Sequence, residues 1–186
     1  MNVYPIEAGN FKLDGGAMFG VVPKSLWTKT NPADADNMIE MSSRCMLVEN
    51  SDKLILVDTG MGDKQSEKFF KYYKRWGSDN LVKSINSAGF SIDDVTDVLL
   101  THLHFDHCGG AVAWDSTKEA YDVLFKNANY WSNEKHWGWA TNPNPREKAS
   151  FLDENLFPIK ESGQLKFISN MSKGFNYCKE LGLEIL

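Results

Sequence analysis

A cluster of histidines is the feature of this sequence with the clearest chemical use. Three of the four histidines fall within six residues, in the run Thr101-His102-Leu103-His104-Phe105-Asp106-His107. His102 and His104 follow a strand-like run, and residues i and i+2 of a strand point the same way, so both imidazoles can face one metal ion. Asp106 and His107 come where the chain must turn, and Gly109-Gly110 allows a tight turn there.

The residue types in this cluster indicate metal-dependent hydrolysis. Neutral imidazole and carboxylate are the ligands expected for Zn²⁺ in a hydrolytic site, and the same ligands also bind iron or manganese. Two ions a few ångströms apart polarise a carbonyl or phosphoryl oxygen and lower the pKa of a water between them. The segment therefore predicts half of a two-metal hydrolase site, with His102 and His104 at one ion and Asp106 and His107 at the other.

The elements that must position this cluster begin with short strands. Val3 to Ala8 and Ala17 to Val22 predict one hairpin, and Arg44 to Glu49 with Leu54 to Val57 predict a second. The polar segment Thr28 to Asn37 between them is long enough for a loop that overhangs a site.

The rest of the chain alternates between helical and strand-like patterns. Apolar residues at helical spacing predict two helices around Phe69–Tyr73 and Leu81–Ala88, and a buried strand, Val95 to Leu100, runs directly into the histidines. Further on, Tyr121–Tyr130 is expected to hold a helix end and a short strand. Two helices are expected at Asn133–Ala140 and Pro145–Asn155, and two strands at Gln164–Ile168 and Leu183–Leu186. With no repeat and no linker, residues 1–186 are expected to form a single domain.

Composition narrows the class of partner. The net charge is −5 with both signs scattered along the chain, which disfavours nucleic acid and anionic membrane and leaves a small-molecule substrate. Cys45, Cys108 and Cys178 form no CxxC pair, so neither a disulfide framework nor a thiolate zinc site is indicated. The sequence shows no signal-peptide pattern and no apolar run of membrane-spanning length, so a cytoplasmic protein is expected. A homodimer stays open.

Two motifs resemble those of a known family. The run from Thr101 to His107, followed by Gly109-Gly110, is similar to the HxHxDH signature of the metallo-β-lactamase superfamily. Leu56-Val57-Asp58-Thr59-Gly60 resembles the second marker of that family, a strand that ends in Asp-Thr-Gly. Within the superfamily the chain looks most like the lactonase and organophosphate-hydrolase-like branch, which is related to glyoxalase II. The resemblance covers about residues 1–160 and implies an α+β fold, the αββα sandwich.

The resemblance also implies roles for individual residues. It assigns His102 and His104 to a first metal ion and Asp106 and His107 to a second, with zinc expected and iron or manganese as alternatives. It implies that Asp106 also orients the nucleophilic water, and that Asp58 supports the ligands from behind. The implied reaction is hydrolysis of an ester, lactone, thioester or related bond by a metal-bound hydroxide.

The family pattern continues beyond what this sequence offers. It calls for a third histidine in a Gly-His-Thr-like loop, a bridging aspartate and a last histidine. After His107 the sequence holds only His136, in a segment with a helical pattern. The sandwich is therefore expected to be incomplete at its C-terminal end, and the metal to be bound weakly by this chain.

Three other functions compete with hydrolysis. A di-iron oxidoreductase of the flavodiiron type has a similar core, but it requires a flavin domain and more carboxylate ligands. A nuclease of the RNA-processing branch is disfavoured by the acidic charge. An inactive or binding half-domain is the non-enzymatic alternative, because the later metal ligands are absent.

Several further residues suggest chemistry, and for most of them a structural role is favoured. Cys108 is expected to be a small buried thiol rather than a ligand. His136 is expected on an amphipathic helix that buries its indoles, rather than in a substrate pocket lined by Trp131, Trp137 and Trp139. Arg44 is expected in an ion pair rather than as an anchor for a substrate anion. One group is expected to form a solvated helix face: Lys64, Lys68, Lys71 and Lys74.

Overall fold

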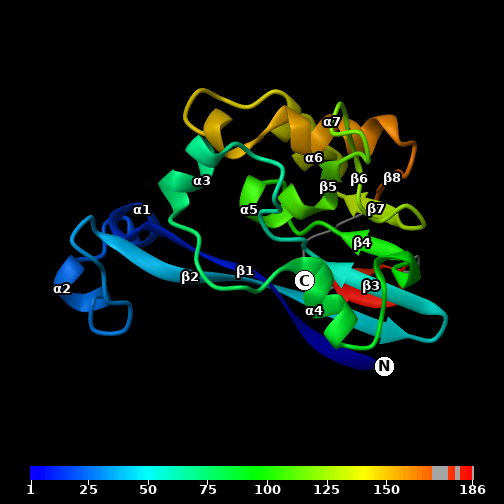
Figure 1. Ribbon diagram of the computed structural model, residues 1–186, viewed down its shortest axis with the longest axis horizontal. Coiled ribbons are helices and arrows are strands. Elements are labelled where there is room, and N and C mark those ends of the chain that lie inside the picture. Colours follow the sequence, from blue (N-terminus) through cyan, green and yellow to red (C-terminus); the bar gives the residue numbers. More distant parts are fainter. Residues whose placement is uncertain (169–175, 179–180, 186) are drawn as a thin grey trace.

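The centre of the fold is a six-stranded mixed sheet (Figure 1). The computed structural model describes residues 1–168, 176–178 and 181–185. The strands, in spatial order, are β1 (Asn2–Asp14), β2 (Met38–Asn50), β3 (Lys53–Val57), β4 (Asp97–Leu99), β7 (Asn129–Ser132) and β8 (Leu165–Phe167). The first three strands are antiparallel neighbours, whereas β3, β4, β7 and β8 run parallel to one another. The expected α+β class is confirmed.

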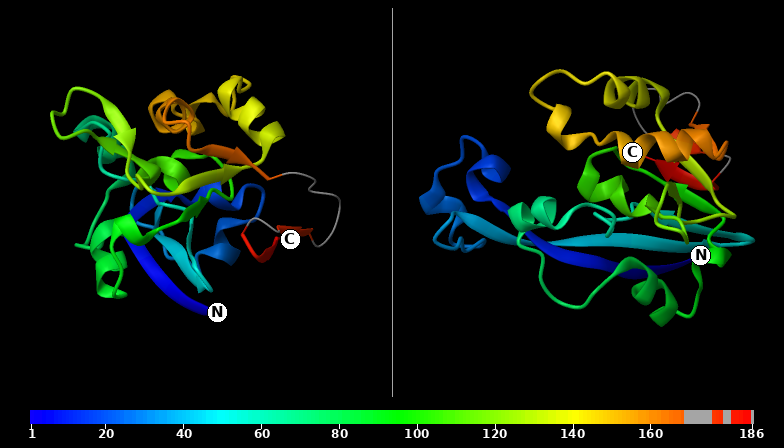
Figure 2. Two further views of the ribbon diagram at one scale, coloured as in Figure 1. Left: turned by 90° about the vertical axis from the view of Figure 1, so that its right-hand side faces the viewer. Right: turned by 45° about the horizontal axis from the view of Figure 1, so that its top comes forward.

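Helices α4, α6 and α7 cover one face of this sheet, where they share a core with the strands. The α-helices are α1 (Gly15–Phe19), α2 (Lys24–Trp27), α3 (Glu67–Tyr73), α4 (Leu81–Ser87), α5 (Phe105–Cys108), α6 (Glu134–Thr141) and α7 (Asp153–Glu161). Short 3-10 turns are η1 (Ile92–Asp94), η2 (Gly109–Ala111) and η3 (Lys148–Ser150). Helix α4 packs on β1 at one edge of that face, and α6 and α7 lie towards the edge formed by β7 and β8 (Figure 2). In the described part of the chain, no helix is long and apolar enough to cross a membrane.

Two small hairpins complete the fold. The pair β5 (Val112–Trp114) and β6 (Tyr121–Val123) packs against α7. The other pair is β9 (Asn176–Cys178) and β10 (Leu183–Ile185), which confirms a strand at the expected C-terminal position. Leu186, the last residue of that expected strand, lies outside the described residues.

The first predicted hairpin is wrong in its second strand. The segment Ala17 to Val22 is not extended, because the Asp14 carboxylate accepts a hydrogen bond from the Ala17 N–H at 2.7 Å and starts helix α1. Strand β1 pairs instead with β2, and the two form a long ribbon that carries α1 and α2 at its far end (Figure 2). The second predicted hairpin, β2 with β3, is confirmed.

Two later predictions also need correction. Residues 121–130 hold two strands, β6 and the start of β7, and no helix end. The predicted helix Pro145–Asn155 is replaced by η3 and by α7, which begins only at Asp153. The reason is local, because the Asn144 side chain accepts from the Arg146 and Glu147 N–H groups and closes a separate turn. The helices predicted around Phe69, Leu81 and Asn133 are confirmed.

The largest core cluster lies between the sheet and its helices. It combines inward-facing residues of the strands with the apolar faces of α4, α6 and α7, among them Ile6, Leu47, Leu56, Ile85, Val98, Trp137 and Leu156. Because β3 and β4 are parallel neighbours fixed by this core, their carboxyl ends meet at one edge of the sheet. That edge carries the Asp-Thr-Gly motif and the histidine run side by side.

Candidate metal centre

Asp58 joins the two motifs at the sheet edge. Its N–H donates to the Leu99 carbonyl at 2.9 Å, which continues the pairing of β3 with β4 for one residue. Its carboxylate accepts from the Thr101 N–H at 2.9 Å and from the Thr101 hydroxyl at 2.8 Å. The same carboxylate lies 2.8 Å from Nδ1 of His107. Asp58 therefore fixes both ends of the histidine run.

The four expected ligands lie in one cluster. The ring centroids of His102 and His104 are 4.7 Å apart, and those of His102 and His107 are 3.9 Å apart. Asp106 Oδ2 lies 3.6 Å from Nε2 of His107. The chain brings these side chains together because β4 ends at Leu99 and helix α5 begins at Phe105, which turns Asp106 and His107 back towards the strand end.

The chemistry of these donors fits a metal ion. Because Asp58 engages Nδ1 of His107, Nε2 of that ring is left facing the cluster, which is the usual arrangement of a metal-binding histidine and its supporting carboxylate. Burial, followed by the nearby His107 and His104, lowers the pKa of His102 to about 4, so this imidazole is neutral at pH 7. Burial lowers the pKa of His107, but the Asp58 hydrogen bond and the Asp106 charge outweigh it, and the net shift is upward.

The four side chains lie close together but do not surround a common point. Among the described residues, no three His, Cys, Asp or Glu side chains are arranged so that they could hold a metal ion. The rings of His102 and His107 lie against each other and leave no room for an ion between them. An ion held by both imidazoles would need the two rings farther apart than they lie here.

Removal of the Asp58 charge should weaken metal binding. Asn tolerates the left-handed backbone of this residue (φ 59°), so Asp58→Asn keeps the fold but loses the ionic partner of His107. Loss of such a supporting carboxylate is expected to lower the affinity for Zn²⁺ or Co²⁺ by about 10–100-fold, measured by competition with a chelator. Asp63→Asn is a matched control, since Asp63 is exposed on the same loop and pairs with Arg75. Equal affinity in the two variants would contradict this role.

His136 has a role that the sequence pattern does not reveal. Its Nε2 accepts a hydrogen bond from the N–H of Leu103, between His102 and His104, at 3.0 Å. Burial and the nearby His104 lower the pKa of His136, which keeps Nε2 free to accept. The residue thus supports the backbone of the histidine run. The expected burial of indoles holds for Trp137 but is wrong for Trp139, which is 49% exposed.

The expected solvated lysine face is wrong for one member. Lys68, Lys71 and Lys74 are exposed, but Lys64 precedes helix α3 and is only 5% exposed. Its ammonium donates to the carbonyl of Gly109, just after the histidine run. The prediction was wrong because Lys64 lies four residues before Lys68, which is helical spacing, although helix α3 begins only at Glu67.

Two structural readings are confirmed. Cys108 is buried, its thiol donates to the Leu103 carbonyl at 3.3 Å, and burial raises the pKa of this thiol to about 12. Arg44 forms an ion pair in which Nε lies 2.6 Å from the Glu7 carboxylate. Arg44 nevertheless stays 65% exposed at its side chain.

A cavity of about 130 Å³ opens beside the cluster. Its lining includes Asp58, Asp106, His107 and Arg44. An aromatic group borders the same region: the ring of Phe105 lies 5.3 Å from that of Phe69 and 4.9 Å from that of Tyr73, centroid to centroid. The candidate site thus combines a cluster of histidine and aspartate side chains with a neighbouring apolar surface.

Comparison with known proteins identifies the family. Residues 39–167 match the model of the metallo-beta-lactamase superfamily, a range that includes both motifs and most of the sheet. The chain belongs to this superfamily, as the HxHxDH and Asp-Thr-Gly resemblances predict.

Individual relatives are hydrolases. The chain is 29% identical over 104 residues to an N-acyl homoserine lactonase of Bacillus cereus, which covers 50% of this chain and 40% of the relative. It is 34% identical over 83 residues to the corresponding lactonase of Bacillus thuringiensis, covering 39% of this chain and 33% of the relative. The chain therefore spans less than half the length of these curated relatives.

Solved structures share the fold over nearly the whole chain. A probable metal-dependent hydrolase from Staphylococcus aureus superposes with a TM-score of 0.81 at 29% identity, covering 94% of this chain and 62% of that one. A dizinc quorum-quenching lactonase in complex with its product superposes with a TM-score of 0.65 at 24% identity, covering 95% and 63%. At that identity the second likeness concerns the fold alone.

Proposed function

We propose that this chain carries part of the active site of a zinc-dependent hydrolase that cleaves small esters or lactones. The observation that carries the proposal is the contact of Asp58 with Nδ1 of His107 at 2.8 Å, inside the cluster of His102, His104 and Asp106. A partly buried carboxylate behind a histidine that faces other donors is typical of a catalytic metal centre. Relatives named as lactonases and metal-dependent hydrolases support the same class.

Each side chain has a proposed task. His102 and His104 would bind one ion, and Asp106 and His107 the other, while Asp58 orients His107. When bound, two ions supply Lewis-acid polarisation of the substrate carbonyl and a hydroxide at neutral pH. Asp106 would accept the hydrogen bond of the attacking water and so fix its direction.

The substrate class follows from the surroundings of the cluster. The cavity beside Asp106 and His107 is small, and Arg44 in its lining is already paired with Glu7. The rings of Phe105, Phe69 and Tyr73 offer an apolar surface for an acyl group. Two related structures hold N-hexanoyl homoserine products, which are ring-opened lactones with an acyl chain. A lactone or ester with an apolar acyl chain is therefore the proposed substrate.

The competing functions gain no support from the comparisons. The relatives and neighbours quoted above are lactonases and metal-dependent hydrolases, so neither the flavodiiron oxidoreductase nor the nuclease has an observation in its favour. Because the chain spans 62% of the S. aureus hydrolase, turnover by this chain alone is part of what must be tested.

Metal binding tests this proposal directly. The 186-residue chain is expected to bind Zn²⁺ or Co²⁺ weakly, because it supplies four of the donors and the affinity of a metal site falls with each missing ligand. Addition of zinc should support hydrolysis of an aryl ester or a lactone, and a chelator should abolish it. Measurement of bound metal and of ester hydrolysis would be made for the parent and for a His102→Ala, His104→Ala double variant. Binding and turnover that survive loss of both histidines would overturn the proposed centre.

A further inference from the structure

The loop that follows β3 packs backbone to backbone against the end of the metal-binding segment. The N–H of Thr59 donates to the His107 carbonyl at 2.7 Å, and the N–H of Gly110 donates to the Gly60 carbonyl at 3.0 Å. The approach is so close that a Cβ on Gly109 would lie 2.2 Å from the Met61 carbonyl oxygen. These contacts with the loop, residues 58–64, therefore fix the conformation of the turn after His107. Asp58 lies at the start of the loop and Lys64 at its end.

Lys64 holds the far end of that turn. Its ammonium donates to the carbonyl oxygen of Gly109, which also accepts the N–H of Val112. Lys64 forms no ion pair in the described part of the chain. A buried ammonium is costly unless its contacts repay the loss of water. Burial lowers the pKa of Lys64 to about 8, against the raising effects of Cys108, Glu154 and Asp63.

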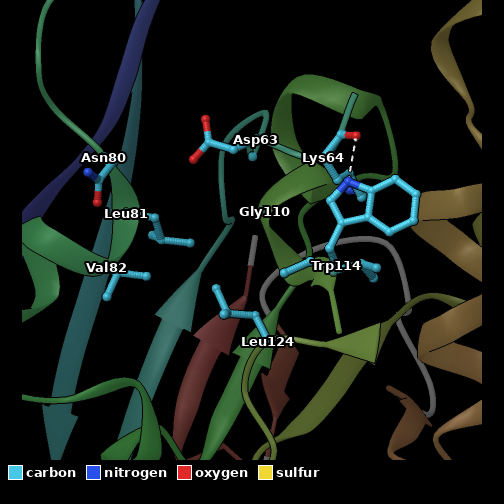
Figure 3. A pocket seen from close by; sticks show the side chains of 11 residues that line it. Asp63, Lys64, Asn80, Leu81, Val82, Gly110, Trp114 and Leu124 are labelled. Carbon is cyan, nitrogen blue, oxygen red and sulfur yellow. Dashed lines mark hydrogen bonds between the residues drawn. The ribbon is translucent and has the colours of Figure 1, made fainter. Parts of the chain in front are cut away.

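The main chain of Lys64 also forms a hydrogen bond with a side chain from another element. Its carbonyl accepts from Nε1 of Trp114 at 3.2 Å, the contact drawn as a dashed line in Figure 3. A pocket of about 280 Å³ lies alongside, bounded by Leu81, Gly110 and Leu124 among others (Figure 3). Because the backbone is held and the pocket leaves space, substitutions of the side chain test the amine without forcing the loop to move.

We propose that Lys64 is a positioning residue for the metal centre, whose ammonium holds the Gly109 carbonyl and so fixes helix α5 with Asp106 and His107. A cation at the C-terminal end of this short helix satisfies a carbonyl and complements the helix dipole. The inference rests on the proposed function insofar as it concerns metal, but the hold on the turn is a property of the metal-free chain.

Hydrogen exchange in the metal-free protein tests the hold on the turn. In Lys64→Met, the amides of Cys108 and Gly110 are expected to exchange about tenfold faster or more, since loss of a charged hydrogen bond costs at least that in local opening. The amides of strands β2 and β3 should not change. Lys64→Gln offers an uncharged donor with less disturbance, should Lys64→Met fold poorly. Lys68→Met, on the exposed face of α3, is the matched control.

Zinc affinity tests the consequence for the metal centre. Lys64→Met should bind Zn²⁺ about tenfold more weakly than the parent, in the range found for residues that support metal ligands. Lys64→Arg should restore both exchange protection and affinity, because it keeps a cation with hydrogen-bond donors at this position. Unchanged exchange at 108–110, equal acceleration in β2 and β3, or an Arg variant no better than Met would overturn the proposal. A parent that binds no zinc would instead overturn the metal centre itself, and with it the positioning role towards metal.

Discussion

Asp106→Ala is expected to lower kcat on a lactone or aryl ester by about 10²–10³-fold or more in the zinc-loaded protein. The loss is large because Asp106 has two proposed tasks, as ligand of one ion and as acceptor for the attacking water. Its carboxylate lies 3.6 Å from Nε2 of His107 and lines the neighbouring cavity. Asp106→Asn keeps the shape but loses the charge, so it should fall as far. Steady-state kinetics and metal content, measured together, separate loss of the ion from loss of the acceptor.

Cys108→Ser is the control for this prediction. Cys108 is two residues away and its thiol is a potential nucleophile, but burial raises its pKa to about 12, so the thiol is protonated at neutral pH. The Ser variant should stay within a few-fold of the parent, since a serine hydroxyl can keep the bond to the Leu103 carbonyl. An inactive Cys108→Ser beside an Asp106→Asn with normal turnover and metal content would favour a thiol nucleophile instead.

Gly110→Ala is expected to cost about 3 kcal/mol of folding stability, the upper part of the range for overpacked sites. A Cβ at this position would lie 2.2 Å from the Thr59 carbonyl oxygen, a backbone atom that cannot rotate away. At this chain length such a loss corresponds to a fall in Tm of roughly 6–12 °C. The metal-free protein should show the fall as well, because the clash is with the backbone and not with a ligand.

Gly138→Ala makes the same chemical change, but it is expected to raise the folding stability. Gly138 lies within helix α6, and a Cβ there would meet nothing within 4 Å. Replacement of glycine by alanine inside a helix stabilises by about 0.5–1 kcal/mol. Thermal unfolding of both variants should therefore move Tm in opposite directions. A Gly110→Ala variant as stable as the parent would show that the loop and the turn are not packed as closely as described.

The sequence alone determined the class of fold and the candidate site. The candidate site is a local sequence pattern: His102 and His104 are two residues apart after an apolar run, and Asp106 and His107 precede two glycines. Such a local pattern can be recognised without knowledge of the fold. The same holds for the hairpin of β2 with β3 and for the helices near Leu81 and Asn133. Predictions from hydrophobic periodicity were wrong where a side chain accepts hydrogen bonds from nearby backbone N–H groups, as Asp14 does at α1 and Asn144 does before α7.

The resemblance in sequence already implied support from Asp58, but only the tertiary structure decided which side chain Asp58 contacts and which other distant residues support the site. Asp58 reaches His107 across 49 residues and His136 reaches Leu103 across 33, because parallel β3 and β4 end at one edge and α6 packs beside it. The burial of Lys64 follows in the same way, since only the close approach of two glycine-containing loops encloses its amine. Such contacts depend on the path of the chain between the partners. Residue type and spacing do not encode that path.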